Sequence, residues 1–487
     1  MRKFTVSTII CLLALLLLVA CGGNGGEEPL YTLDDLLYIA RERRLDIIAN
    51  RPAHEQLLEL TRDREPETID LTQFVSDNTG QAITAAQAIE DVELFFKALR
   101  QIYGPYIYFG GDAVFVPVFD ELIAEIATRE TILPFQLENM IYHALGVVIN
   151  DNHFILGNNR IGQRANFFTS TEPFDRNERG FIHRASGHVV AEIEGRNKYD
   201  VLRLSMDEQG NIFYSAVIYE LGPVGMARRN LSVVFDNGEN MTLALEQHRT
   251  AWQPPNPPSL EWVDGVPVVT VMSMGITVYG EFSFDYLATF LSFVEKIHYE
   301  AIVIIDVRSN FGSSNSMTRL WLYNLVGELV PQNFVGLFRY EYNSMIDYWE
   351  GLQNYFSADD LIFLTEITPF DAMHLTLYNR HSREIVENDQ IIIMLVDGYT
   401  FSAAESFVDA MLSMANVLVM GENTFGGLIS RGNYIWTLPN SGIDFMLGSA
   451  LSVFAKGQYA EGVGIAPDVW VHGDALAAAL ALLGNDD

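Results

Sequence analysis

Apolar residues recur every three or four positions through the first third of this 487-residue chain. Clear examples are the stretches Ala88–Leu99 and Phe119–Ile126, each of which keeps its apolar residues on one face of a helix. The spacing predicts an N-terminal helical region over residues 31–179. We expect its helices to bury these faces against a common core.

The pattern changes after residue 180, where short segments alternate apolar and polar residues. Such alternation is typical of strands, and turn signals such as Asp236-Asn237-Gly238 separate the segments. These features predict a small β-rich module over residues 180–253. The proline cluster at 254–258 follows the module and indicates a domain boundary.

From residue 259 to residue 487, strand and helix patterns alternate. Apolar runs such as Ala301–Val307 and Ile391–Val396 predict buried strands, and the amphipathic stretch that begins at Ser402 predicts a helix. Alternation of this kind produces a sheet covered by helices. The sequence therefore predicts an α/β (α+β) fold, with a helix-covered sheet domain at 259–487.

Composition narrows the possible partners. The formal net charge is -33, which repels nucleic acid and anionic lipid, so we expect no nucleic-acid partner. A hydrophobic content of 49% supplies enough material for two or three cores, and a charged fraction of 19% argues against disorder.

The first thirty residues predict where the protein is located. Arg2 and Lys3 precede an apolar stretch from Ile9 to Val19, which is too short for a stable membrane span and typical of a secretory signal. The run Leu18-Val19-Ala20-Cys21 resembles the bacterial lipobox. This resemblance implies that residues 1–20 are removed, that Cys21 is lipidated, and that residues 21–30 form a flexible tether. We expect an extracytoplasmic protein anchored to a bacterial membrane by Cys21.

An ordinary signal peptide with an incidental cysteine is the alternative. In the anchored form Cys11 is lost with the signal and Cys21 is acylated. The mature chain would then have no thiol for a disulfide, a catalytic cysteine or a metal site.

The segment Gly398–Glu405 carries the strongest chemical signal. It follows the predicted strand Ile391–Val396 and leads into a predicted helix, so Ser402 lies at a strand-to-helix turn. Such a turn exposes the serine hydroxyl and surrounds it with backbone N–H groups, as a nucleophile that attacks a carbonyl requires. The alternative is that Ser402 only caps the helix, a common role for serine.

Four segments occur in an order that resembles the tail-specific, or C-terminal processing, serine proteases and their tricorn-core relatives. They are Asp306–Ser313, Thr400–Glu405, Gly421–Gly426 and Glu461–Asp468, and the resemblance covers roughly Leu260–Val471. It implies that Ser402 is the nucleophile. It also implies an oxyanion hole formed by Ala403 N–H and a backbone N–H near Gly312. Ser313 replaces the second glycine of the family turn, which leaves the identity of this second donor open.

The family resemblance also indicates which base activates the serine. The processing proteases use a lysine after the Thr-Phe-Gly segment, but this chain has Gly427 there. The tricorn-like branch uses the histidine of an Asp-Gly-His-Thr segment and a later glutamate. Asp151-Asn152-His153-Phe154 resembles that segment, with asparagine and phenylalanine in place of glycine and threonine. The resemblance therefore implies His153 as the base and Glu461 as the carboxylate that orients it.

Three charged residues of these segments have a structural interpretation. Asp306, Arg308 and Asp468 are not needed as nucleophiles once Ser402 has that role. We expect them to form ion pairs near the ends of the sheet.

The sequence therefore predicts a serine endopeptidase that cleaves peptide or protein substrates through an acyl-enzyme. It has no metal-binding motif and implies neither a cofactor nor a metal. The alternative is a noncatalytic lipoprotein that keeps the fold and binds a peptide or another ligand. The departures from the family pattern at Gly427, Asn152, Phe154 and Ser313 favour that alternative. The joint presence of Ser402, His153 and Glu461 opposes it. The physiological substrate and the oligomeric state stay open.

Overall fold

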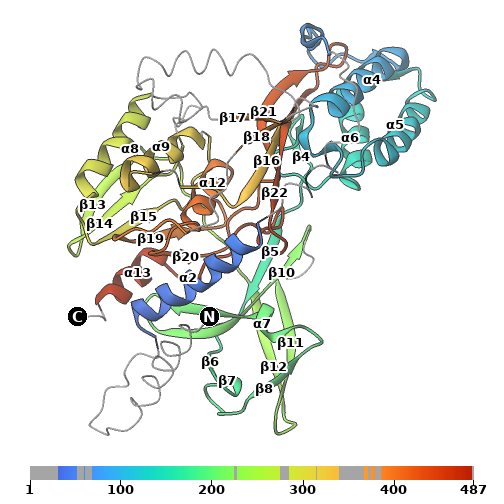
Figure 1. Cartoon of the computed structure of the whole chain (residues 1–487). Coiled ribbons are helices and arrows are strands. Elements are labelled where there is room, and N and C mark those ends of the chain that lie inside the picture. The colour runs from blue at the N-terminus through green and yellow to red at the C-terminus, as the bar shows by residue number, and fades with distance from the viewer. Residues whose placement is uncertain are drawn as a thin grey trace, which may run out of the picture.

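The computed structural model shows a central sheet with helices on both faces, a β-rich module and a separate helical region (Figure 1). The predicted signal segment, the tether and Cys21 lie outside the residues that the structure describes. The described residues are 31–51, 57, 60, 69–223, 227–274, 284–313, 315–328, 330–338, 367–370, 375–378 and 385–484.

The central sheet is formed mainly by parallel strands. Its order is β13-β14-β15-β19-β20-β23, and only the β13–β14 pair is antiparallel. The strand bounds are β13 (Ser259–Val263), β14 (Val266–Thr270), β15 (Ile302–Asp306), β19 (Ile391–Val396), β20 (Val417–Gly421) and β23 (Val469–His472). The α/β fold predicted from the sequence is confirmed.

Helices cover both faces of this sheet, which explains its continuous apolar strands. In β19, Ile392 and Met394 join the core on one face, whereas Ile393 and Leu395 join the core on the other. A strand buried on both faces has no polar side to alternate with, so its sequence is apolar throughout. The first face is covered by α8 (Phe284–Ile297), α9 (Asn315–Val326) and α12 (Ala403–Met411), and the second by α2 (Leu33–Ala49) and α13 (Ala475–Gly484).

The β-rich module begins earlier than residue 180. Strand β5 pairs with β10 and β12 of the module, so the module starts near residue 165. Two consecutive aromatic residues, Phe167 and Phe168, hide the alternation that would have revealed β5 in the sequence. The module contains β5 (Ala165–Thr169), β6 (Phe174–Asn177), β7 (Gly180–His183), β8 (Val190–Ile193), α7 (Lys198–Val201), β9 (Leu202–Asp207), β10 (Ile212–Leu221), β11 (Arg228–Phe235) and β12 (Asn240–Gln247).

The module and the central sheet are joined edge to edge. Strand β9 pairs in parallel with β23, with Ser205 opposite Trp470 and Met206 opposite Val471. The described strands of the two regions therefore form one sheet, whose path runs from β13 to β8.

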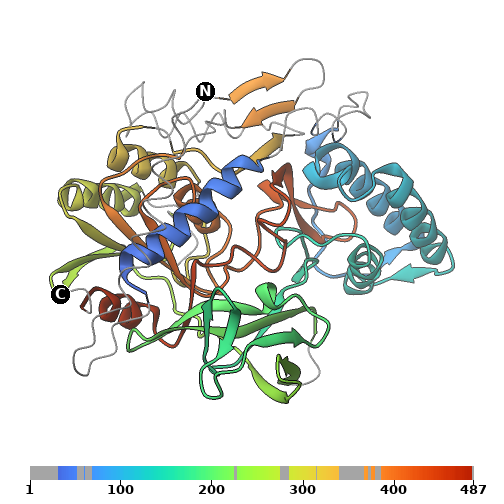
Figure 2. The same ribbon diagram turned by 60° about the horizontal axis from the view of Figure 1, so that its bottom comes forward.

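The helical region lies to one side of this sheet, as Figure 2 also shows. Helices α4 (Ala85–Ile102), α5 (Asp112–Ile126) and α6 (Pro134–Gly146) surround a core that includes aromatic residues such as Phe95 and Phe154. Helix α2 does not join them, although the sequence placed it in the same region. Its buried face, with Leu33, Leu36 and Ala40, packs on the central sheet, because helical spacing shows that a face is buried but not what covers it.

A second sheet connects the helical region to the C-terminal domain. Its path is β17-β18-β16-β22-β3-β4, and β21 pairs with β22. The pair of β22 with β3 brings the segment just after residue 153 against the C-terminal domain. The remaining described elements are η2 (Leu71–Gln73), β1 (Ile83–Thr84), η3 (Gly104–Tyr106), β2 (Thr131–Ile132), β3 (Ile155–Leu156), β4 (Asn159–Arg160), β16 (Phe334–Phe338), β17 (Ile367–Phe370), β18 (Leu375–Tyr378), β21 (Ser430–Thr437) and β22 (Asp444–Phe454).

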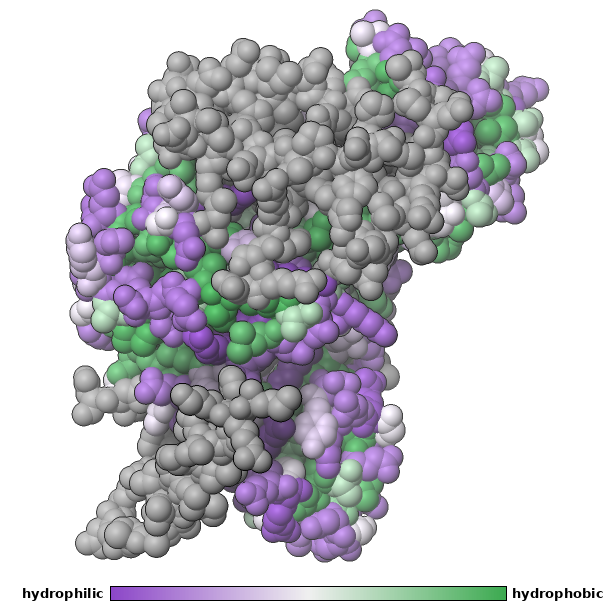
Figure 3. All heavy atoms as spheres, viewed as in Figure 1, coloured by the Kyte–Doolittle hydropathy of each residue, from purple (hydrophilic) through white to green (hydrophobic). Residues whose placement is uncertain are grey.

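Polar and apolar residues are interspersed on the face drawn in Figure 3. Within the described part of the chain, no helix combines the length and the apolar character that crossing a membrane requires.

Candidate active site

Ser402 lies between β19 and α12 in a strained backbone conformation. Its φ of 59° and ψ of -116° lie in a region that residues other than glycine rarely adopt. A serine that only caps a helix has an extended backbone, which Ser402 lacks. The turn predicted from the sequence is therefore present, and its geometry is that of a nucleophile elbow.

His153 reaches Ser402 from the loop that precedes β3. The distance from His153 Nε2 to Ser402 Oγ is 2.8 Å, although 249 positions separate the two residues in the sequence. The two side chains therefore lie within the distance that proton transfer between a base and its nucleophile requires. Two contacts hold the histidine in place: its backbone N–H donates to Asp151 Oδ1 at 2.8 Å, and its ring packs on the Phe401 ring at a centroid distance of 4.7 Å.

The surroundings of His153 favour the neutral imidazole. Burial lowers the pKa of His153 to about 3, and the positive charges of Arg160 and Arg431 act in the same direction. A neutral imidazole can accept the Ser402 proton at Nε2 only if Nδ1 carries the ring hydrogen. Among the described residues, no acceptor lies within hydrogen-bond distance of Nδ1.

Glu461 lies beside the histidine loop but makes no hydrogen bond to the imidazole within the described residues. One carboxylate oxygen accepts from Asn152 N–H at 2.8 Å, and the other accepts from Ile429 N–H at 3.0 Å and from Tyr459 Oη at 2.7 Å. Burial and the neighbouring Asp151 raise the pKa of Glu461. The expected direct contact is not made, and Glu461 instead links the histidine loop to the turn after residue 427.

Asp151 anchors the other side of the same loop. It is fully buried and accepts hydrogen bonds from Tyr103 Oη at 2.8 Å and from Ser430 Oγ at 3.0 Å, besides the one from His153. In the sequence, Asp151 is only one residue of the histidine motif. In the structure, its bonds to Tyr103, directly after α4, and to Ser430 of β21 join both elements to this loop.

The two predicted oxyanion residues lie against each other. A Cβ atom on Gly312 would come within 2.7 Å of Ala403 N and 2.8 Å of Ser402 Cβ, so only glycine allows this approach. The N–H of Gly312 donates to Asn310 Oδ1 at 2.9 Å and is therefore already occupied. Ala403 N–H, at the first turn of α12, has no acceptor among the described residues. The second donor stays unassigned.

Glu405 supports the serine turn, and sequence reasoning missed it. It is fully buried, and its carboxylate accepts from the backbone N–H of Ser402 at 3.0 Å and from those of Gly426 and Gly427 at 2.8 Å. Burial raises the pKa of Glu405, while these hydrogen bonds act against that effect. A glutamate in the first turn of a helix is common, so the sequence carried no signal for this role.

An aromatic ring occupies the space beside Gly427, the position at which the processing proteases have a lysine. A Cβ atom on Gly427 would lie 1.9 Å from the Phe401 ring, so a lysine does not fit there. The same ring packs on His153. Phe401 thus fills the space of the lysine and supports the imidazole in its place.

Asp306, Arg308 and Asp468, which we expected to be structural, do form ion pairs. Arg308 pairs with Asp306 at 2.7 Å and with Asp474 at 2.9 Å, and Asp468 pairs with Arg44 of α2 at 2.8 Å. This expectation is confirmed.

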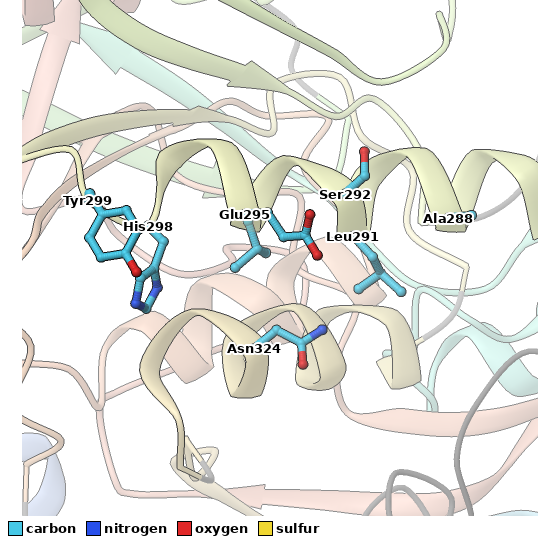
Figure 4. A pocket seen from close by; sticks show the side chains of 8 residues that line it. Ala288, Leu291, Ser292, Glu295, His298, Tyr299 and Asn324 are labelled. Atoms are coloured by element: carbon cyan, nitrogen blue, oxygen red, sulfur yellow. The ribbon is translucent and has the colours of Figure 1, made fainter.

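Figure 4 shows a separate hollow of about 640 Å³. Its side chains come mostly from α8 and the residues after it, including Glu295 and His298, and Asn324 of α9 faces them. It shares no lining residue with the Ser402 site. Within the described part of the chain, no three histidine, cysteine, aspartate or glutamate side chains are grouped as a metal site would require.

This chain is similar to several known proteins. Residues 274–471 match the model of peptidase family S41. Similar solved structures include mature CPAF (14% identity, 82% of this chain and 96% of that chain, TM-score 0.42) and the photosystem II D1 C-terminal processing protease (14%, 82% and 97%, TM-score 0.36). The tricorn protease is also similar (12%, 83% and 37%, TM-score 0.33). No curated protein matches the chain.

Proposed function

We propose that this serine peptidase, whose residues 274–471 match the model of peptidase family S41, is an endopeptidase that uses Ser402 as nucleophile and His153 as base. One observation carries the assignment: the 2.8 Å contact between His153 Nε2 and the hydroxyl of a serine in a strained strand-to-helix turn. The substrate is a peptide or a protein.

The reaction follows from the groups around this contact. His153 takes the Ser402 proton as the hydroxyl attacks the scissile carbonyl, and Ala403 N–H donates to the oxygen that becomes negative. The intermediate collapses when His153 returns the proton to the leaving amine, which leaves an acyl ester on Ser402. Water, deprotonated by the same histidine, then hydrolyses the ester.

Asp151 and Glu461 hold the loop that carries His153 from two sides. Asp151 accepts the backbone N–H of His153, and Glu461 accepts that of Asn152. Burial raises the pKa of both carboxyls, and their proximity disfavours ionisation of both at once. In this proposal Asp151 and Glu461 act as positioning residues, which hold the histidine loop through its backbone N–H groups.

A fluorophosphonate probe tests the nucleophile. The wild-type chain should be labelled, and Ser402→Ala should abolish the labelling. His153→Ala should reduce the labelling rate by at least a hundred-fold, because the hydroxyl then has no base. Ser292→Ala, at an exposed serine of α8, is the matched control and should react as the wild type does.

A wild-type chain that is folded yet inert to the probe and to a broad peptide library would contradict the peptidase mechanism. If that inert chain still bound a peptide at the Ser402 site, the noncatalytic binding alternative would replace it.

The proposal includes an extracytoplasmic location with a lipid on Cys21. Its support is the sequence Leu18-Val19-Ala20-Cys21 after a short apolar stretch, followed by a glycine-rich tether. Cells fed a fatty-acid analogue should label the wild-type chain and should not label Cys21→Ser. Cys11→Ser is the control, because it lies inside the apolar stretch, and it should be labelled normally. Equal labelling of the wild type and Cys21→Ser would exclude the anchor.

A further inference from the structure

An apolar cleft of about 530 Å³ opens beside the Ser402 site. It lies at the carboxyl ends of β14 and β15, the edge where ligands bind in sheets of this kind. None of the described residues that line it is charged. The side chains that shape it are those of Trp252, Pro255, Met272, Phe311 and Tyr399.

Part of this cleft comes from the segment that the sequence marked as a domain boundary. Trp252 and Pro255 flank Gln253, whose backbone N–H donates to Ser309 Oγ at 3.1 Å. Asn256 O accepts from Tyr286 Oη at 3.3 Å. The first bond holds the segment against the turn after β15, and the second holds it against α8. The segment therefore forms a wall of the cleft as well as connecting two domains.

The cleft adjoins the acyl side of the predicted reaction centre. It shares Gly312 with the turn that packs on Ser402 and Ala403. Phe401 lies between the cleft and the histidine, since its ring is 5.4 Å from that of Phe311 and 4.7 Å from that of His153, centroid to centroid. The leaving amine must lie on the histidine side, because His153 protonates it. The cleft is therefore on the opposite side.

We infer that this cleft binds a large apolar side chain of the substrate residue whose carbonyl Ser402 attacks. The inference rests on the proposed function and names its substrate class: peptides with phenylalanine, leucine or methionine before the cleaved bond. A charged side chain would lose its water in the cleft, and none of the described lining residues would offer it an opposite charge. An alanine would leave the aromatic walls uncovered.

Binding to an inactive variant tests the inference without depending on catalysis. In Ser402→Ala, the acetylated tripeptide Ala-Ala-Phe, which represents the acyl product, should bind at least ten-fold more tightly than Ala-Ala-Ala or Ala-Ala-Asp by calorimetry. Adding Trp252→Ala should reduce this preference at least five-fold. Trp262→Ala is the matched control, because Trp262 is 50% exposed like Trp252 but does not line the cleft, and it should keep the preference.

Kinetics provide the second measurement. In the chain with Ser402 intact, kcat/KM for a matched pair of peptides with Phe or Ala before the cleaved bond should show the same preference and the same loss in Trp252→Ala. Equal binding of the three tripeptides, or a preference that Trp252→Ala leaves unchanged, would overturn the inference. A chain that discriminates between the tripeptides yet is inert to fluorophosphonate would instead overturn the proposed function.

Discussion

Single residues decide which base this site can use. Gly427 leaves room for the Phe401 ring, and that ring packs on His153, so the lysine and the histidine arrangements exclude each other here. The strained backbone of Ser402 is held by Glu405, which accepts its N–H. These contacts support the serine and histidine pair of the proposed mechanism.

The pKa of His153 predicts how kcat/KM and the stability of the fold depend on pH. Its folded value, about 3, lies well below the ordinary value near 6.5, so the base stays neutral through mildly acidic pH. We expect kcat/KM to stay level down to about pH 5, instead of falling near pH 6.5. The folded state also loses stability as pH falls from 6.5 toward 3, because only the unfolded chain then binds this proton. Circular dichroism at each pH separates the two effects, and a fall in kcat/KM centred near pH 6.5 with the fold intact would contradict the expectation.

At the scale of helices and strands, the sequence predicted several elements of the C-terminal domain. β19 has the predicted bounds and α12 begins one residue after Ser402, because an unbroken apolar run and an amphipathic period are local signals. The partner of α2 could not be predicted, since it depends on contacts hundreds of positions away. The same limit applies to Glu461, whose carboxylate binds backbone N–H groups that no pattern identifies.

The buried ion pair between Arg44 of α2 and Asp468 predicts how much stability the docking of this helix contributes. Arg44 is fully buried and its charge is balanced by Asp468, so Asp468→Ala would leave a buried cation without its carboxylate. We expect this variant to lose about 3 to 5 kcal/mol of unfolding free energy in urea titrations. Arg41→Ala is the control on the same helix. It removes the exposed pair with Glu387 and should cost under about 1 kcal/mol. Equal losses in the two variants would show that Asp468 does not hold α2 in this way.

Across the whole molecule, one sheet passes from the central domain into the β-rich module through β23 and β9. The hydrophobic cores on the two sides of this junction share Leu204 as a packed neighbour. The module is therefore part of the same hydrogen-bonded sheet. Its strand β9 pairs with β23, whereas in a hinged domain that strand would be unpaired on this side.

This continuity predicts cooperative unfolding. Native-state hydrogen exchange should give the amides of β9 and β10 the same opening free energy as those of β19 and β20, with the same dependence on denaturant. The exposed residues Ala185 and Ser186 serve as the control, and their amides should exchange rapidly. A module that opens at a distinctly lower free energy would show that the β9–β23 pair does not couple the two regions.

The separation of His153 and Ser402 along the chain also has a consequence in time. A ribosome makes the histidine loop first, and the serine turn follows 249 positions later, before Glu461, which holds that loop through Asn152. A growing chain therefore lacks the assembled pair until these later segments have been made. On the proposed mechanism, the enzyme keeps itself inactive during its own production and needs no removable inhibitory segment for that interval.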